Sequence, residues 1–298
     1  MKKYLASLVV ILILSATVFA QDSTFSGWKK SMVIDFTVTQ TSYSDSWTGG
    51  EAGSINWVSN LNGSAEKQLS PKFNYRTSLK LSFGQTHSQN TNLPDKPWKK
   101  PQKSTDLIDW ENVGKFTFGW FVDPYAAFRV ESQFYDGSVP DHKRWLSPMR
   151  LTESAGMAKK LYEKDKDFVT SRMGFAIRQL MVKEFIDDVD YKTETISSSD
   201  GGIESVTDAE LTLHKNIKYT SKLSLFKALY YSEKDSFKGT TAEDYWKAGD
   251  VNWENIISAS ITKIITVNLY TQLLYDKEIS VKGRFKETLA IGFVINMI

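Results

Sequence analysis

Apolar and polar residues alternate along most of the chain. Ile34, Phe36 and Val38, for example, alternate with Asp35 and Thr37. Successive side chains of a β-strand point to opposite faces, so a period of two indicates a strand with one apolar and one polar face. The pattern predicts twelve strands, at 31–40, 54–66, 73–85, 109–122, 125–135, 151–161, 168–181, 206–216, 218–231, 251–262, 264–275 and 284–297.

The connections between the predicted strands alternate between short and long. The longest, at 86–108, 183–205 and 232–250, are polar. An even number of strands, with short turns at one end and long loops at the other, is typical of outer-membrane β-barrels. Because open sheet edges are costly in lipid, the first strand should pair with the last. The sequence therefore predicts an all-β protein, a transmembrane antiparallel up-and-down β-barrel of about twelve strands over residues 31–298.

The N-terminus has the three parts of a secretory signal peptide. Two lysines come first, then the compact apolar stretch 5–14, and Val18-Phe19-Ala20 fits a cleavage site. Residues 1–20 are therefore predicted to be removed, and 21–30 to form a short periplasmic lead-in. The alternative is an uncleaved anchor, for which the apolar stretch is short. Cleavage removes two lysines and brings the formal charge of +2 to zero, which gives no support to nucleic-acid binding.

The aromatic residues indicate which face points outward. A soluble barrel or sandwich would show the same alternation with its apolar face buried. On the predicted apolar face, however, aromatics gather at both strand ends around an aliphatic middle, as a lipid-facing surface requires. They are Tyr75, Trp120 and Tyr219 at the short-turn end, and Trp57, Trp110, Phe134, Tyr231, Trp253 and Tyr275 at the long-loop end. This favours the outer membrane of a Gram-negative-type bacterium over a soluble secreted protein.

The polar face is predicted to line the lumen and carries charges in mid-strand. The lumen-facing charged candidates are Arg76, Lys80, Arg129, Glu131, Arg172, Arg178, Lys222 and Glu254. Together with Lys286, the basic residues of this face slightly outnumber its acids, which include Asp35, Asp208 and Glu210. One hypothesis is a narrow pore for small polar or anionic solutes. The other is a closed structural or surface-binding barrel, in which the charges form salt bridges across a narrow lumen and the extracellular loops carry the function.

The sequence offers little for catalysis. It has no cysteine and three histidines, which excludes disulfides and thiolate sites. Outer-membrane phospholipase A has the same strand number, but its catalytic His and Ser lie two residues apart, and here Gln89 follows His87 at that spacing. His142 and His214 also lack Ser and carboxylate partners at usable spacing. We predict no enzymatic activity, metal or cofactor. The expected partners are outer-membrane lipid, the barrel-assembly machinery and a possible small polar solute.

Two loop features have both a structural and a functional interpretation. The run Trp47-Thr48-Gly49-Gly50-Glu51 fits a turn into the second strand better than a ligand-binding loop. The loop aromatics are expected to cap the barrel mouth by packing on one another, although they could instead contact a carbohydrate or a partner protein. They are Trp98, Trp145, Tyr245 and Trp246.

Most of the predicted mature chain resembles a bacterial envelope family catalogued only as domain of unknown function 3078, and one motif of the resemblance is specific. The specific motif is the run from Thr39 to Ser44, followed by Trp47, Gly49-Gly50-Glu51 and Ser54-Ile55. Ser104-Thr105-Asp106 and Leu151-Thr152-Glu153-Ser154 are also similar. The resemblance implies an outer-membrane β-barrel and supplies no reaction, substrate or catalytic residue.

Overall fold

A computed structural model describes residues 27–43, 52–93, 95–139, 141–187 and 190–296. The predicted signal peptide, most of the predicted lead-in, the 47–51 motif and the last two residues lie outside these ranges.

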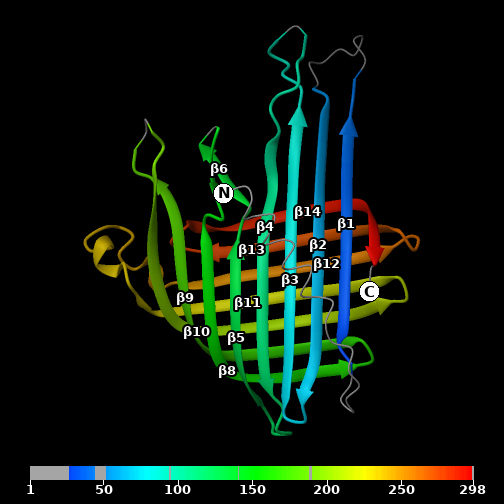
Figure 1. Cartoon of the computed structure of the whole chain (residues 1–298), viewed down its shortest axis with the longest axis vertical. Coiled ribbons are helices and arrows are strands. Elements are labelled where there is room, and N and C mark those ends of the chain that lie inside the picture. The colour runs from blue at the N-terminus through cyan, green and yellow to red at the C-terminus, as the bar shows by residue number, and fades with distance from the viewer. Residues whose placement is uncertain (1–26, 44–51, 94, 140, 188–189, 297–298) are drawn as a thin grey trace.

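The described chain forms a closed barrel of twelve antiparallel strands, which confirms the predicted fold. In Figure 1 the strands of the front wall stand vertically, with alternating directions, and those of the rear wall cross behind them, as tilted strands on opposite walls of a barrel do. The barrel strands are β1 (Lys29–Thr41), β2 (Ser54–Ser70), β3 (Phe73–Ser88), β4 (Gln102–Phe116), β5 (Asp123–Ser132), β8 (Met149–Lys164), β9 (Asp167–Phe185), β10 (Thr193–His214), β11 (Ile217–Tyr231), β12 (Gly249–Ser260), β13 (Ile265–Asp276) and β14 (Ser280–Asn296).

Turns and loops separate to opposite ends of the barrel as predicted. The short-turn end holds the connections 71–72, 117–122, 165–166, 215–216 and 261–264. The long-loop end holds 42–53, 89–101, 133–148, 186–192 and 232–248, together with the much shorter turn 277–279.

Two additions to the barrel lie in the long loops. The connection between β5 and β8 contains a hairpin of β6 (Tyr135–Val139) and β7 (His142–Trp145), which the sequence did not predict. The connection between β11 and β12 contains two 3-10 helices, η1 (Lys234–Phe237) and η2 (Tyr245–Lys247). Within the described ranges, no helix has the length and apolar character needed to cross a membrane.

Several predicted boundaries were wrong. The strand predicted at 109–122 is β4, which starts at Gln102 because its first residues pair with β3 and ends at Phe116 before a turn with Gly119 at φ +74°. Trp120 therefore lies in a turn and not on a strand. The strand predicted at 206–216 is β10, which starts at Thr193 because a segment of polar composition pairs with β9.

The outward face carries the apolar and aromatic side chains that the alternation predicted. Phe175 and Ile177 of β9 and Ile203 of β10 are exposed to the surroundings of the barrel. The indoles of Trp110 and Trp253 also lie on this surface, and their Nε1 atoms donate to hydroxyls of the adjacent strands at 3.1 Å each. The prediction that Tyr231 lies on the outward face is wrong. A β-bulge between β10 and β11 changes the phase, and Tyr231 pairs with Asp200 and packs near Trp246.

β8 and β9 are curved strands (Figure 1) that approach each other closely at a pair of glycines, which we call the glycine bend. Gly156 and Gly174 face each other in this strand pair, and a Cβ on either would lie 2.2 Å from a backbone oxygen of the other strand. Only glycine permits this approach. This bend lies opposite the β1–β14 junction, with β9 to β14 on one side and β8, β5, β4, β3, β2 and β1 on the other. The barrel is thus two six-stranded walls that meet at a glycine bend and at the junction of first and last strands.

Candidate functional site

The predicted lumen charges lie on β3, β5, β9, β11 and β12, and seven of the eight form ion pairs. The ion-paired residues are Lys80, Arg129, Glu131, Arg172, Arg178, Lys222 and Glu254. The eighth, Arg76, lies with its guanidinium carbon 5.4 Å from the ring centre of Phe168.

A network of ion pairs fills the middle of the barrel. On the β4–β5 wall, Arg129 Nε and Nη2 donate to both carboxylate oxygens of Asp109, at 2.8 and 2.9 Å, and Nη2 lies 3.0 Å from Glu131. Beside them Glu111 of β4 accepts hydrogen bonds from Arg172 and from Lys222, the latter at 3.0 Å. We call the eight members of this network the charge lattice. They are Lys80, Asp109, Glu111, Arg129, Glu131, Arg172, Lys222 and Glu254.

Two contacts of the charge lattice cross the lumen. Glu111 on β4 meets Lys222 on β11, and four strands separate these two along the shorter way around the barrel. Lys80 on β3 meets Glu254 on β12 at 3.5 Å, again with four strands between them. The side chains of Asp109, Glu111, Arg129, Arg172 and Lys222 are each 10% exposed or less. Side chains therefore occupy the lumen at this level.

A second charged cluster lies nearer the long-loop end. Arg178 of β9 donates from Nε to Asp200 of β10 at 2.8 Å and from Nη1 to Asp250 of β12 at 2.8 Å. Its guanidinium also lies over the ring of Phe226, 3.5 Å from the ring centre. Phe226 packs with Ala176 and Ala228, and Trp246 of η2 packs against this apolar group. Of the four loop aromatics, Trp246 thus covers the barrel wall, whereas Trp98 and Trp145 are about half exposed.

The sequence analysis missed four acids of these two clusters, and they change the charge balance. Asp109 and Glu111 flank the outward Trp110, so the alternation itself places them on the lumen face. Asp200 and Asp250 lie in the segments 183–205 and 232–250, whose polar composition predicts loops. The charge lattice contains four cations and four carboxylates and is formally neutral, and the Arg178 cluster has one cation for two carboxylates. The basic excess that favoured an anion-preferring pore is therefore absent from these two clusters.

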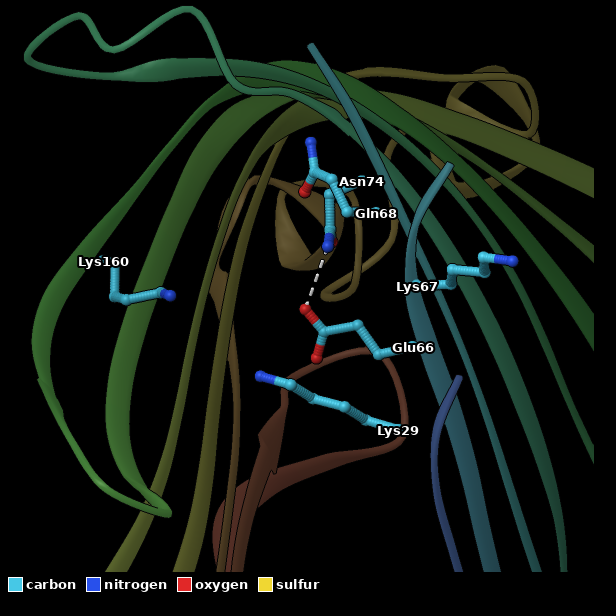
Figure 2. A pocket seen from close by; sticks show the side chains of 6 residues that line it. All are labelled: Lys29, Glu66, Lys67, Gln68, Asn74 and Lys160. Atoms are coloured by element: carbon cyan, nitrogen blue, oxygen red, sulfur yellow. Dashed lines mark hydrogen bonds between the residues drawn. The ribbon is translucent and has the colours of Figure 1, made fainter. Parts of the chain in front are cut away.

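A small pocket of about 160 Å³ opens on the other side of the charge lattice, at the short-turn end. Figure 2 shows the amines of Lys29 and Lys160 directed into it beside the carboxylate of Glu66, with Lys67 pointing away. Asn74 Nδ2 donates to Glu66 at 3.1 Å. Within the described part of the chain, no group of three or more His, Asp or Glu residues is arranged to hold a metal ion.

The turn 277–279 brings a further carboxylate to the Arg178 cluster. Partial burial raises the pKa of Glu278 to about 7, and the negative charges of Asp276, Asp250 and Asp200 act in the same direction. Arg178 acts against this shift. Glu278 therefore titrates near neutral pH at the long-loop end.

Residues 38–137 match the model of a family described as Protein of unknown function (DUF3078). The predicted family resemblance is confirmed. The match runs from the end of β1 to the hairpin strand β6 and includes the DUF3078-like motif around Thr39. No curated protein sequence matches the chain.

Solved structures with some similarity to the chain include outer-membrane barrels. The COG4313 outer membrane channel from Pseudomonas putida F1 is 11% identical, with 94% of this chain and 100% of that chain covered and a TM-score of 0.43. The translocator domain of the autotransporter NalP from Neisseria meningitidis is 6% identical, with 97% and 94% covered and a TM-score of 0.38. At these values the similarities say nothing about what this chain binds or transports.

Proposed function

We propose that the chain spans the outer membrane as a barrel whose lumen is shut at mid-depth by the charge lattice. In this proposal it is a closed structural or surface-binding protein that acts through its extracellular loops, with outer-membrane lipid around it and the barrel-assembly machinery as its route of insertion. The single observation that carries closure is the buried contact of Glu111 with Lys222 across the lumen.

The outer surface supports membrane insertion. Exposed apolar side chains occur on most of the barrel strands, for example Phe36 on β1, Phe175 on β9 and Ile257 on β12. A water-soluble monomer rarely exposes continuous apolar surface of this extent, because such surface drives association. Hydrocarbon accepts it, while strand pairing satisfies most of the backbone groups of the barrel wall.

The chemistry of the charge lattice supports closure. Ionised side chains that are withdrawn from water need opposite charges and hydrogen bonds to be tolerated. Arg129 has a bidentate contact with one carboxylate, and Glu111 uses both oxygens on two cations. These partners fix the side chains in the lumen, and a solute would have to break at least one pair to pass.

A narrow pore for small polar or anionic solutes is the second candidate. It is favoured by the Lys80–Glu254 pair, which has the longer separation of 3.5 Å and leaves the Lys80 side chain 33% exposed. Rearrangement of this one contact would open the least covered side of the lattice.

Single-channel conductance in planar bilayers tests the proposal on refolded mature chain. Protease protection first establishes insertion. We expect inserted wild-type chain to show no defined current steps and the double variant Glu111→Ala/Lys222→Ala to show them. Lys100→Ala/Asp141→Ala is the matched control, because it removes an exposed ion pair of 2.9 Å in the loops.

Each other outcome contradicts one part of the proposal. Steps in the wild type would refute closure and favour the pore, whose ion selectivity could then be measured. Steps in the control variant would show that the current does not come from the lattice. Failure of correctly folded chain to insert would refute the membrane assignment.

A further inference from the structure

The junction between the first and last strands is paired over a short stretch only. The ladder between β1 and β14 consists of four residue pairs, from Val33 with Asn296 to Phe36 with Phe293. On its other side β1 forms thirteen pairs with β2, and β14 forms eleven with β13. Both strands continue beyond the four pairs toward the long-loop end, β1 to Thr41 and β14 back to Ser280.

Exposure shows that the two strands separate beyond the ladder. From Val38 to Thr41 every residue of β1 is exposed, and so is every residue from Phe285 to Leu289 of β14. A strand with neighbours on both sides would hide alternate residues inside the barrel. Figure 1 shows β1 (blue) and β14 (red) meeting near the end of β14 and diverging from there. Thr37 and Gly292 still lie against each other. We call the separated region beyond them the open seam, bounded by residues 38–41 and 284–291.

The open seam has a chemical requirement if the barrel is in a membrane. Among the described residues, the ladder leaves the facing backbone edges of 38–41 and 288–291 without each other as partners. In hydrocarbon each unsatisfied N–H or C=O costs several kcal/mol. Donors and acceptors alternate along both edges, and an extended polypeptide matches this alternation because it supplies both groups at the same spacing.

We propose that the open seam binds an extended strand of a partner polypeptide. This proposal rests on membrane insertion and not on closure of the lumen. The binding mode is addition of a β-strand to the exposed edge of β14, in which backbone hydrogen bonds give affinity and alternate side chains give specificity.

The side chains of β14 specify what the partner strand carries. Its outward residues Phe285, Leu289 and Ile291 are each more than 60% exposed, so the lipid-facing positions of the partner should be apolar. On the lumen side Lys286 pairs in register with Gln272, and the Nε of Arg284 is buried without a hydrogen-bond partner among the described residues. A carboxylate at the lumen-facing positions of the partner would match these two cations.

Cysteine crosslinking tests the geometry, and the chain suits it because it contains no cysteine. The test pair is Gln40→Cys/Leu289→Cys, two positions that would face each other if the ladder continued in register. The control pair is Phe36→Cys/Phe293→Cys, which the ladder does pair. A disulfide needs Cα atoms within about 7 Å. In inserted chain we expect the control to crosslink under mild oxidation and the test pair to remain reduced.

A peptide then tests binding. The probe copies residues 29–41, which carry apolar residues on one face and Asp35 on the other, with cysteine in place of Gln40. We expect a mixed disulfide with Leu289→Cys chain and none with Leu273→Cys chain, because β13 is paired on both sides. A scrambled peptide should form neither.

The other outcomes overturn the proposal in distinguishable ways. Equal crosslinking of the test and control pairs in inserted chain would show that β1 and β14 remain paired along the seam. In that case only the seam proposal would fail. Disulfide-linked dimers of Leu289→Cys without peptide would assign the seam to a second copy of the chain. If the chain inserts and the test pair stays reduced, but no mixed disulfide forms between the peptide and Leu289→Cys chain, strand binding is refuted. Failure to insert would overturn both proposals.

Discussion

Replacement of Glu111 by Gln removes one charge from the centre of the lumen and leaves the side-chain shape unchanged. Glu111 accepts hydrogen bonds from Arg172 and from Lys222, and the three side chains are 9%, 8% and 10% exposed. Water therefore has little access to compensate the two cations that remain. Removing one partner of a buried ion pair costs about 3–5 kcal/mol, so we expect the free energy of unfolding to fall by that amount.

Reversible urea unfolding of vesicle-inserted chain measures this loss. Glu163→Gln is the matched control, because Glu163 pairs with Lys160 at 2.6 Å where the side chains are 55% and 41% exposed. Exposed pairs contribute about 0–1 kcal/mol. Lys222→Met added to Glu111→Gln should recover part of the loss, since it removes one uncompensated cation. If Glu111→Gln costs no more than Glu163→Gln, the charge lattice does not hold the walls together and the argument for closure fails.

Three further predictions concern the membrane surface, the long-loop end and the glycine bend. Leu269→Arg should destabilise vesicle-inserted chain by about 2–4 kcal/mol and reduce the inserted fraction seen by heat-modified gel mobility, whereas Leu93→Arg in a loop should not. Glu278 favours the folded state in its protonated form, so its contribution is complete below pH 4.5 and is lost as pH rises through about 7. Thermal unfolding of Glu278→Gln chain should lack this loss, and equal pH dependence in both proteins would contradict the assignment. Gly156→Ala should lower the free energy of unfolding by about 1–3 kcal/mol because its Cβ meets backbone, while Gly63→Ala, with its nearest contact at 4.0 Å, should be nearly neutral in the same urea assay.

The alternation along the chain was sufficient to predict the number of strands and the barrel, because a period of two determines which face each residue occupies. Lys80 and Glu254 were assigned to one face from strands far apart in sequence, and they meet across the lumen at 3.5 Å. The sequence does not indicate that Lys80 and Glu254 form an ion pair. Partnership across a lumen depends on strand order, tilt and stagger, which a single sequence does not encode locally.

The failures have local causes. Glu111 follows Trp110 and was overlooked although its phase was available. Asp200 could not be found in this way, because its Ser- and Gly-rich surroundings are typical of a loop and become a strand only by pairing with β9. Tyr231 was assigned to the wrong face because a bulge, which leaves no clear mark in the sequence, shifts the phase of β11.

The charge lattice and the open seam are connected through the two-walled construction of the barrel. Glu111 and Lys80 belong to the wall from β1 to β8, and Arg172, Lys222 and Glu254 belong to the wall from β9 to β14. Each of the three contacts between these residues therefore joins one wall to the other. The glycine bend joins the walls on one side, and only four residue pairs join them on the other. Because the ladder ends before the long-loop half, we infer that the lattice contacts help to limit how far β1 and β14 can separate, and that a strand entering the seam would act against them.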